Sequence, residues 1–132
     1  MEQKVEVKFL EENKFQVKAM TSGVSLCVDR SAPDYKSQGP NPLEVFLSAL
    51  GSCIGVFAKK YLSRHDIGFK ELKIEAKAEF TTNPPTRLTN IGVKVSTDAD
   101  LGSNREVFLR FIKNCPVHNT ILHTDQINIE LV

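Results

Sequence analysis

Alternating apolar and polar positions in the first part of the chain predict three β-strands. Apolar residues occupy every second position over residues 5–9, 15–19 and 24–28, which is the period of a sheet with one solvated face. The polar residues 11–14 separate the first two runs, so we expect a hairpin there. Residues 30–41 are rich in Pro, Ser and other turn-forming residues and are expected to form a loop. Loops of this length are uncommon unless they have a function.

A long apolar helix is predicted from Pro42 to about His65. Asn41 can cap its first turn, and Glu44 can complete a capping box with Asn41. No charged residue occurs over positions 45–58, so the helix is apolar on every side, which is typical of a helix buried on most faces. A chain of 132 residues can hardly enclose such a helix alone. We therefore expect a second copy of the chain to cover part of it.

The rest of the chain adds further strands and helices in separate groups. The predicted elements are strands over residues 72–80 and 91–95, helices over about 104–114 and from Pro116, and a last strand over 127–131. The resulting order βββ-α-ββ-αα-β segregates strands from helices, which is typical of the α+β class. The length predicts one domain, residues 1–132.

Composition and charge argue against several classes of function. Lys and Arg number 17 and Asp and Glu 16, so a net charge of +1 offers no basic face for nucleic acid. No apolar run approaches the ~20 residues that span a bilayer, and residues 1–5 lack the apolar stretch of a secretory signal. No Gly-rich phosphate loop is present, and we expect no cofactor. We therefore expect a cytoplasmic protein with no membrane or nucleic acid partner, whose three cysteines start reduced.

Cys53 lies in the middle of the long helix among small residues. Gly51, Ser52 and Gly55 surround it, and a glycine inside a helix costs about 1 kcal/mol relative to alanine. Two such glycines indicate that another group approaches the helix closely at this point. The alternative is simple helix packing beside an inert core cysteine, since buried free cysteines are common. Cys27 has no small neighbours and no helix end beside it, and is interpreted as an ordinary strand residue.

Cys115 is the second cysteine with a distinctive setting. It precedes Pro116, at the start of the short helix, where the helix dipole would stabilise a thiolate. It also shares the apolar side of the preceding helix with Phe108 and Phe111. Both Cys53 and Cys115 are therefore expected to face the core. A buried pair would form a redox switch, and two unrelated core thiols are the alternative.

Glu44 is the acidic residue that precedes Cys53 in the long helix. The two residues lie half a turn out of phase and about 13 Å apart along the axis, so Glu44 cannot touch Cys53 of its own helix. Capping the helix is the simpler role for Glu44. A part in cysteine chemistry would require another chain or a bent loop.

The spacing of cysteines and histidines near the C-terminal end of the sequence is compared with that of metal ligands. Cys115 and His118 have a ligand-like spacing, and His123 follows. Zinc needs three or four ligands, and Cys53 and His65 lie three turns apart on one helix, so at most one of them could join. We therefore expect no metal site.

Two cysteine motifs resemble those of the OsmC/Ohr family. The core motif of that family resembles residues 39–53, GPNPLEVFLSALGSC, and its second motif resembles residues 114–117, NCPV. The element order, the length and the separation of the two cysteines also fit, so the resemblance covers nearly the whole chain. It implies an OsmC-like fold of antiparallel sheets with a long buried central helix, in an intertwined homodimer with both active sites at the interface.

The resemblance implies a thiol-dependent peroxidase that reduces organic hydroperoxides. Cys53 would attack the peroxide, Cys115 would resolve the sulfenic acid into a disulfide, and a dithiol reductant would restore both thiols. In the family an Arg–Glu pair holds the first cysteine as a thiolate. This chain has Leu43 at the usual glutamate position and Glu44 one place later, and Arg30 stands where OsmC-type members place the arginine.

Another arginine position, used by Ohr-type members, falls in the first hairpin, where this chain has Lys14. Two other functions therefore remain open. One is a thiol- or persulfide-handling redox protein that uses Cys53 and Cys115 without Arg–Glu activation. The other is a non-catalytic dimer that binds a small hydrophobic ligand.

Overall fold

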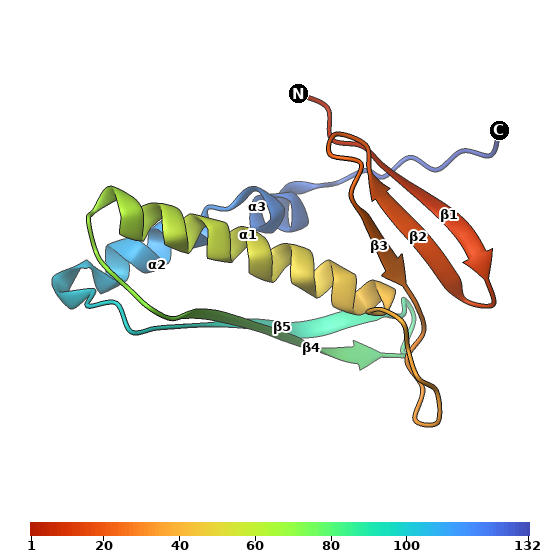
Figure 1. The fold of residues 1–132 in the computed structure, drawn as a ribbon, viewed down its shortest axis with the longest axis horizontal. Helices are drawn as coiled ribbons and strands as arrows, with labels where there is room; N and C mark the ends of the chain where they lie inside the picture. The colour runs from red at the N-terminus through yellow and green to blue at the C-terminus, as the bar shows by residue number, and fades with distance from the viewer. The chain divides into compact units, whose positions relative to one another are not determined.

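Two antiparallel β-sheets and three α-helices make up the chain, and the computed structural model describes all of residues 1–132 (Figure 1). These residues form two compact units, 1–46 and 47–132. The α+β class, with antiparallel sheets and one long helix, is confirmed, and the assignment of residues 1–132 to one domain stays a prediction.

The first unit contains a three-stranded antiparallel sheet. Its strands, in spatial order, are β1 (Val5–Glu11), β2 (Lys14–Ala19) and β3 (Ser25–Val28). Val7 lies opposite Val17, which in turn lies opposite Leu26, so the apolar positions of the three strands share one face. The alternation in the sequence predicted these strands, and β1 and β2 form the expected hairpin.

Much of the apolar face of this sheet is exposed to solvent. Val5, Val7 and Phe9 keep 57–60% of their surface accessible, and Phe9 packs edge-on against Phe15 with ring centroids 5.6 Å apart. A one-sided sheet normally buries its apolar face against another layer. The chain therefore presents an apolar sheet face that remains open in a single copy.

The second unit packs helices on a two-stranded sheet. Helix α1 (Pro42–Arg64) lies along one face of the sheet formed by β4 (Leu72–Thr81) and β5 (Arg87–Thr97) (Figure 1). Helices α2 (Arg105–Lys113) and α3 (Pro116–His123) lie on the same side, after the short 3-10 helix η1 (Gly102–Asn104). The buried core of this unit consists of Leu50, Ile54, Ala58, Tyr61, Leu62, Phe108, Ile112 and Cys115.

Two glycines allow α1 to approach β4 closely. A Cβ atom at Gly55 would lie 3.3 Å from Cγ1 of Ile74, and one at Gly51 would lie 3.6 Å from Cγ2 of Ile74. Side chains larger than alanine at these positions would push the helix away from the strand. The close approach expected around Cys53 is therefore contact between the helix and the sheet.

Helix α1 buries one side in the second unit and leaves part of its surface exposed. Leu50 and Ile54 lie in the core, whereas Leu43 and Phe46 are 39–40% exposed and Val56 is 63% exposed. By length and composition α1 could also cross a membrane, but a core helix of a soluble protein meets the same test. Leu50, Ile54 and Ala58 of α1 belong to the buried core of the second unit.

The last predicted strand, over residues 127–131, does not form. No regular element follows His123, and Ile127, Ile129 and Leu131 are 82%, 92% and 100% exposed. A strand needs a neighbouring strand to satisfy its backbone N–H and C=O groups, and no strand of this chain pairs with the segment. The prediction of a strand at residues 127–131 was therefore wrong.

Candidate active site

Cys53 and Cys115 meet inside the second unit. Cys53 lies in α1 and is partly buried, whereas Cys115 directly precedes α3 and is fully buried. Both are free thiols. Cys115 belongs to the buried core of the second unit and Cys53 packs against that core, and the interaction with Cys53 favours the protonated form of Cys115. The structure thus brings together the two cysteines that the sequence singled out.

The Cys115 thiol has a raised pKa. Burial is the largest cause, and the neighbouring Cys53 acts in the same direction. The backbone N–H of His118 donates to Cys115 Sγ over 3.4 Å and lowers the pKa by less. The N–H groups at the start of α3 do lower the pKa of Cys115, as the sequence led us to expect, but desolvation outweighs them. The raised pKa keeps the Cys115 thiol protonated at neutral pH.

An apolar cavity of about 370 Å³ is lined by sequence neighbours of both cysteines. Leu50 and Ile54 of α1 and Ile112 of α2 contribute to its wall, together with apolar residues of β5 and α3. Lys113 and His118 are the polar side chains of its lining. The volume suits a small apolar molecule with one polar end.

Glu44 performs the capping role that the sequence predicted. The Asn41 backbone N–H donates to Glu44 Oε1 over 3.1 Å, and the Glu44 backbone N–H donates to Asn41 Oδ1 over 2.9 Å. These two bonds form the reciprocal capping box. Ser31 Oγ also donates to Glu44 Oε1 over 3.4 Å, so the carboxylate is connected to the loop that follows Arg30.

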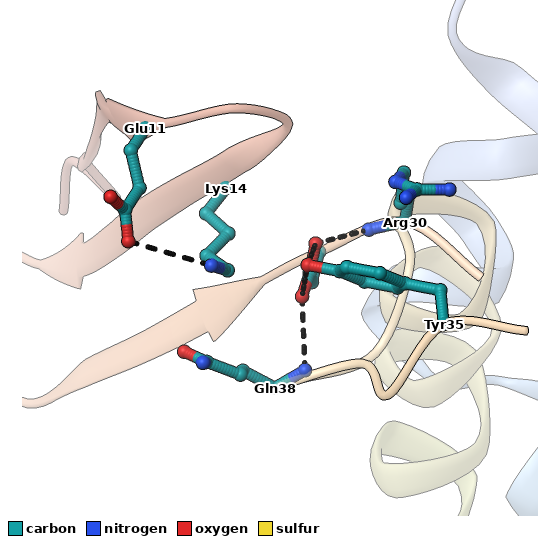
Figure 2. A network of polar contacts seen from close by, with 6 residues as sticks. Glu11, Lys14, Arg30, Tyr35 and Gln38 are labelled. Carbon is teal, nitrogen blue, oxygen red and sulfur yellow. Dashed lines mark hydrogen bonds and ion pairs between the residues drawn. The ribbon is translucent and has the colours of Figure 1, made fainter. Parts of the chain in front are cut away.

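Arg30 begins the loop between β3 and α1, and its side chain stacks on an aromatic ring. Its guanidinium carbon lies 3.9 Å from the centroid of the Tyr35 ring (Figure 2), which is a cation–π contact. Arg30 is an exposed residue. Arg30 and Glu44 both belong to the first unit, whereas Cys53 and Cys115 belong to the second.

Asp29 is a buried charged residue that the sequence did not lead us to expect. It is only 1% exposed, and its carboxylate accepts hydrogen bonds from the backbone N–H groups of Arg30 and Gln38 and from the Tyr35 hydroxyl (Figure 2). Burial raises its pKa, but these donors lower it by more, so Asp29 stays ionised at neutral pH. The sequence contained one indication of this role. Asp29 lies between a strand and a long loop, where the carboxylate of an Asp residue often accepts backbone N–H groups.

Lys14 is a second charged residue whose burial was not anticipated. It is 8% exposed and donates to Glu11 Oε1 over 3.5 Å (Figure 2). Burial lowers its pKa, but Tyr35 and Glu11 raise it by more, so Lys14 stays charged. Its charge also favours the ionised form of Asp29. The first unit therefore holds two cations, Lys14 and Arg30, near one buried carboxylate.

Cys115 and His118, whose spacing resembles that of metal ligands, make local contacts instead. The His118 backbone caps the turn through the Cys115 sulfur, and the His118 imidazole Nδ1 contacts the Lys113 carbonyl over 2.6 Å. No group of three or more His, Cys, Asp and Glu side chains is arranged to hold a metal ion.

The sequence of this chain is similar to those of one family of known proteins. The family model described as OsmC-like protein matches residues 35–131. The chain is 26% identical to a hydroperoxide reductase of Mycoplasma genitalium, over 99% of this chain and 96% of that protein.

Two solved structures with the same fold illustrate its range. An OsmC-like protein from Mycoplasma pneumoniae has a TM-score of 0.80 and 20% identity, covering 93% of this chain and 89% of the other. An organic hydroperoxide resistance protein of Bacillus subtilis has a TM-score of 0.63 and 14% identity, covering 93% and 92%.

Proposed function

Because this chain belongs to the OsmC-like protein family, we propose that it is a thiol-dependent peroxidase that reduces organic hydroperoxides. The observation that carries the proposal is the packing of one free thiol, Cys53 on α1, against the buried core that contains the other, Cys115 at the start of α3. The similarity to a protein named hydroperoxide reductase supports the same substrate class.

The first step oxidises Cys53. Its thiolate attacks the terminal oxygen of the hydroperoxide, the O–O bond breaks, and the alkoxide takes a proton and leaves as an alcohol. Cys53 is left as a sulfenic acid. Cys115 is suited to the second role, because its raised pKa keeps it protonated while Cys53 reacts.

The second step joins the two sulfurs. The sulfur of Cys115 attacks the sulfur of the Cys53 sulfenic acid, and the Cys115 proton and the departing hydroxyl leave together as water. One hydroperoxide and two thiols thus become one alcohol, one water and one disulfide. A dithiol reductant then restores both thiols by exchange.

Arg30 and Glu44 are proposed to assist the first step. A cation near Cys53 favours its thiolate, and a guanidinium can serve a thiolate and a carboxylate together through its planar set of N–H donors. The fixed Glu44 carboxylate and the connection of Ser31 to it support this assignment. Arg30 lies in the loop between β3 and α1, and Glu44 lies in the first turn of α1 directly after it. This loop is long enough to have a function.

The active form is proposed to be a homodimer. The open apolar face of β1–β3, the exposed Phe46 and Val56 of α1 and the unpaired segment 127–131 all support it. Exposed apolar side chains gathered on one sheet face are typical of an interaction surface. Sedimentation at micromolar concentration should give a dimer, and a well-folded monomer would contradict the proposal.

A second candidate function is the binding of a small hydrophobic ligand without chemistry. The cavity of about 370 Å³ between α1, α2, α3 and β5 favours it. Its wall is almost entirely apolar, as in sites that hold drug-sized ligands. Such a protein would keep its thiols when exposed to hydroperoxide.

A thiol titration tests the proposed function and separates it from the second candidate. Free thiols are counted in denaturant before and after one equivalent of cumene hydroperoxide, in a Cys27→Ser background. The peroxidase loses both remaining thiols per chain. A Cys53→Ser variant, the matched control, loses none. Retention of both thiols in the parent would contradict the peroxidase and favour the ligand-binding protein.

A further inference from the structure

The short helix α3 is attached to the second unit mainly at its N-terminal end. None of its own residues is buried, and Leu122 in its last turn is 63% exposed. Val117 in the first turn is partly buried and packs against the core, and the N-cap residue Cys115 has no exposed surface. A helix of eight residues has little stability of its own. The position of α3 therefore depends on the contacts of its first turn.

The sulfur of Cys115 makes one of these contacts. It accepts the backbone N–H of His118 over 3.4 Å, which is a side-chain cap on an N–H group that the helix itself cannot satisfy. Two further contacts join the ends of α2 and α3. The His118 imidazole Nδ1 lies 3.0 Å or less from the Lys113 carbonyl, at 2.6 Å, and Asn119 Nδ2 donates to Asn114 Oδ1 over 3.0 Å. The sulfur that the proposed function places in a disulfide is thus also the cap of α3.

A disulfide between the two cysteines requires their sulfurs to move closer together. Both are free thiols in this structure, and a covalent S–S bond is much shorter than any contact between two free thiols. Cys53 lies in a firmly held part of α1, because the adjacent Ile54 belongs to the core and a Cβ at Gly55 would lie 3.3 Å from Cγ1 of Ile74. Helix α3, by contrast, has no buried residue. The movement should therefore occur on the side of Cys115.

We propose that the disulfide draws the Cys115 sulfur away from the His118 N–H and thereby loosens α3. The proposal rests on the proposed function, which supplies the sulfenic acid of Cys53. The Cys115 sulfur gives an electron pair to the Cys53 sulfur, the S–O bond breaks as the S–S bond forms, and the hydroxyl leaves with the thiol proton as water. The change is local to α3, and the rest of the core keeps its packing.

Loosening α3 would give a reductant access to the disulfide. In the reduced protein Cys115 is fully buried, and thiol–disulfide exchange requires that the attacking thiolate reach a sulfur of the disulfide. His118, Ile121 and Leu122 of α3 also form part of the wall of the apolar cavity of about 370 Å³. The helix therefore acts as a flap that is closed in the reduced protein and opens when the disulfide forms.

Amide hydrogen exchange measured by mass spectrometry tests this flap. Peptides that cover α3 are compared in the reduced protein and in protein oxidised with diamide, which takes two electrons and two protons from a pair of thiols. A Cys27→Ser background is used, the disulfide is verified by peptide mapping, and both samples have the same pH and chain concentration. The α3 peptides should exchange about threefold faster after oxidation, the size of a modest N-cap contribution, and the α2 peptides should not change. Equal or slower exchange of α3 after oxidation would overturn the proposal, as would failure of diamide to join the two cysteines.

Two substitutions of Cys115 test the cap without any oxidation. Cys115→Ser supplies a hydroxyl that can accept the His118 N–H, so the α3 peptides should keep their slow exchange. Cys115→Ala has no acceptor and should reproduce in reduced protein the faster exchange expected of the disulfide form. Cys53→Ser is the matched control for oxidation, because it keeps the cap and cannot form the disulfide, and diamide should leave its α3 peptides unchanged. Equal exchange in Cys115→Ser and Cys115→Ala would show that the cap does not hold α3.

The outcomes separate this proposal from the proposed function. If the parent leaves hydroperoxide unreduced but α3 exchanges faster after diamide, the peroxidase proposal fails and the coupling of the disulfide to α3 stands. If the parent reduces hydroperoxide and α3 exchanges equally in both redox forms, the proposed function stands and the flap is wrong.

Discussion

Oxidation should stabilise the protein substantially, because a disulfide between Cys53 and Cys115 would link α1 to α3 across a long stretch of chain. About 60 residues lie between the two cysteines, and closing a loop of that length removes chain entropy from the unfolded state that corresponds to about 4 kcal/mol. Cys53 already packs against the buried core that contains Cys115 in the reduced protein, so little rearrangement should oppose this gain. A change of about 4 kcal/mol corresponds to a rise in Tm of roughly 10–20 °C for a domain of this size.

Denaturant unfolding measures this difference directly. The protein is treated with one equivalent of cumene hydroperoxide, and its urea midpoint and m-value are compared with those of the reduced protein at the same chain concentration, since dimerisation also affects apparent stability. Cys53→Ser and Cys115→Ser are the controls, and neither should gain stability on oxidation. Equal midpoints for the oxidised and reduced parent, or a lower midpoint after oxidation, would refute the reasoning that the pair is already placed to cross-link.

Three further predictions follow from the geometry of the site. Cys53→Ser should abolish hydroperoxide turnover, whereas Cys115→Ser should allow one oxidation and then stall; full multiple turnover by Cys115→Ser with a dithiol would contradict its resolving role. Asn41→Ala removes half of the capping box and should cost about 1 kcal/mol in the free energy of unfolding, read from urea curves; an unchanged midpoint would contradict it. Because burial raises the pKa of the Cys115 thiol above its ordinary value of 9.0, the stability it contributes is full below pH 9 and is lost as pH rises through the folded-state pKa. The free energy of unfolding, measured at pH 8, 9 and 10, should fall with rising pH in the parent and fall less in Cys115→Ser. An equal fall in the two proteins would contradict this prediction.

The parts of the fold that depend on local pattern could be predicted from the sequence. The strands β1–β3 follow from strict alternation, and the capping box at Asn41 follows from residue types at fixed spacing. The glycines around Cys53 correctly indicated a close approach to α1, because a Cβ atom at Gly55 would lie 3.3 Å from Cγ1 of Ile74. These features depend on residues that are close in sequence, or on a steric limit that the identity of a single residue reveals.

The remaining features depend on tertiary surroundings that the pattern does not contain. The burial of Asp29 and Lys14 results from the loop folding back on the ends of β2 and β3, and charged residues at such positions are usually solvated. The protonated state of Cys115 depends on how completely it is desolvated, which outweighs the helix end that the sequence reveals. The unformed strand at residues 127–131 needed a partner that one chain does not supply.

The central claim is that hydroperoxide converts Cys53 and Cys115 into a disulfide with each other. Peptide mapping by mass spectrometry after one equivalent of cumene hydroperoxide, with free thiols blocked at once by an alkylating agent, tests it most directly. The account predicts one cross-linked species that joins the peptide containing Cys53 to the peptide containing Cys115, with Cys27 recovered in its alkylated form. Recovery of all three cysteines as alkylated thiols, or a cross-link that involves Cys27 instead, would contradict it.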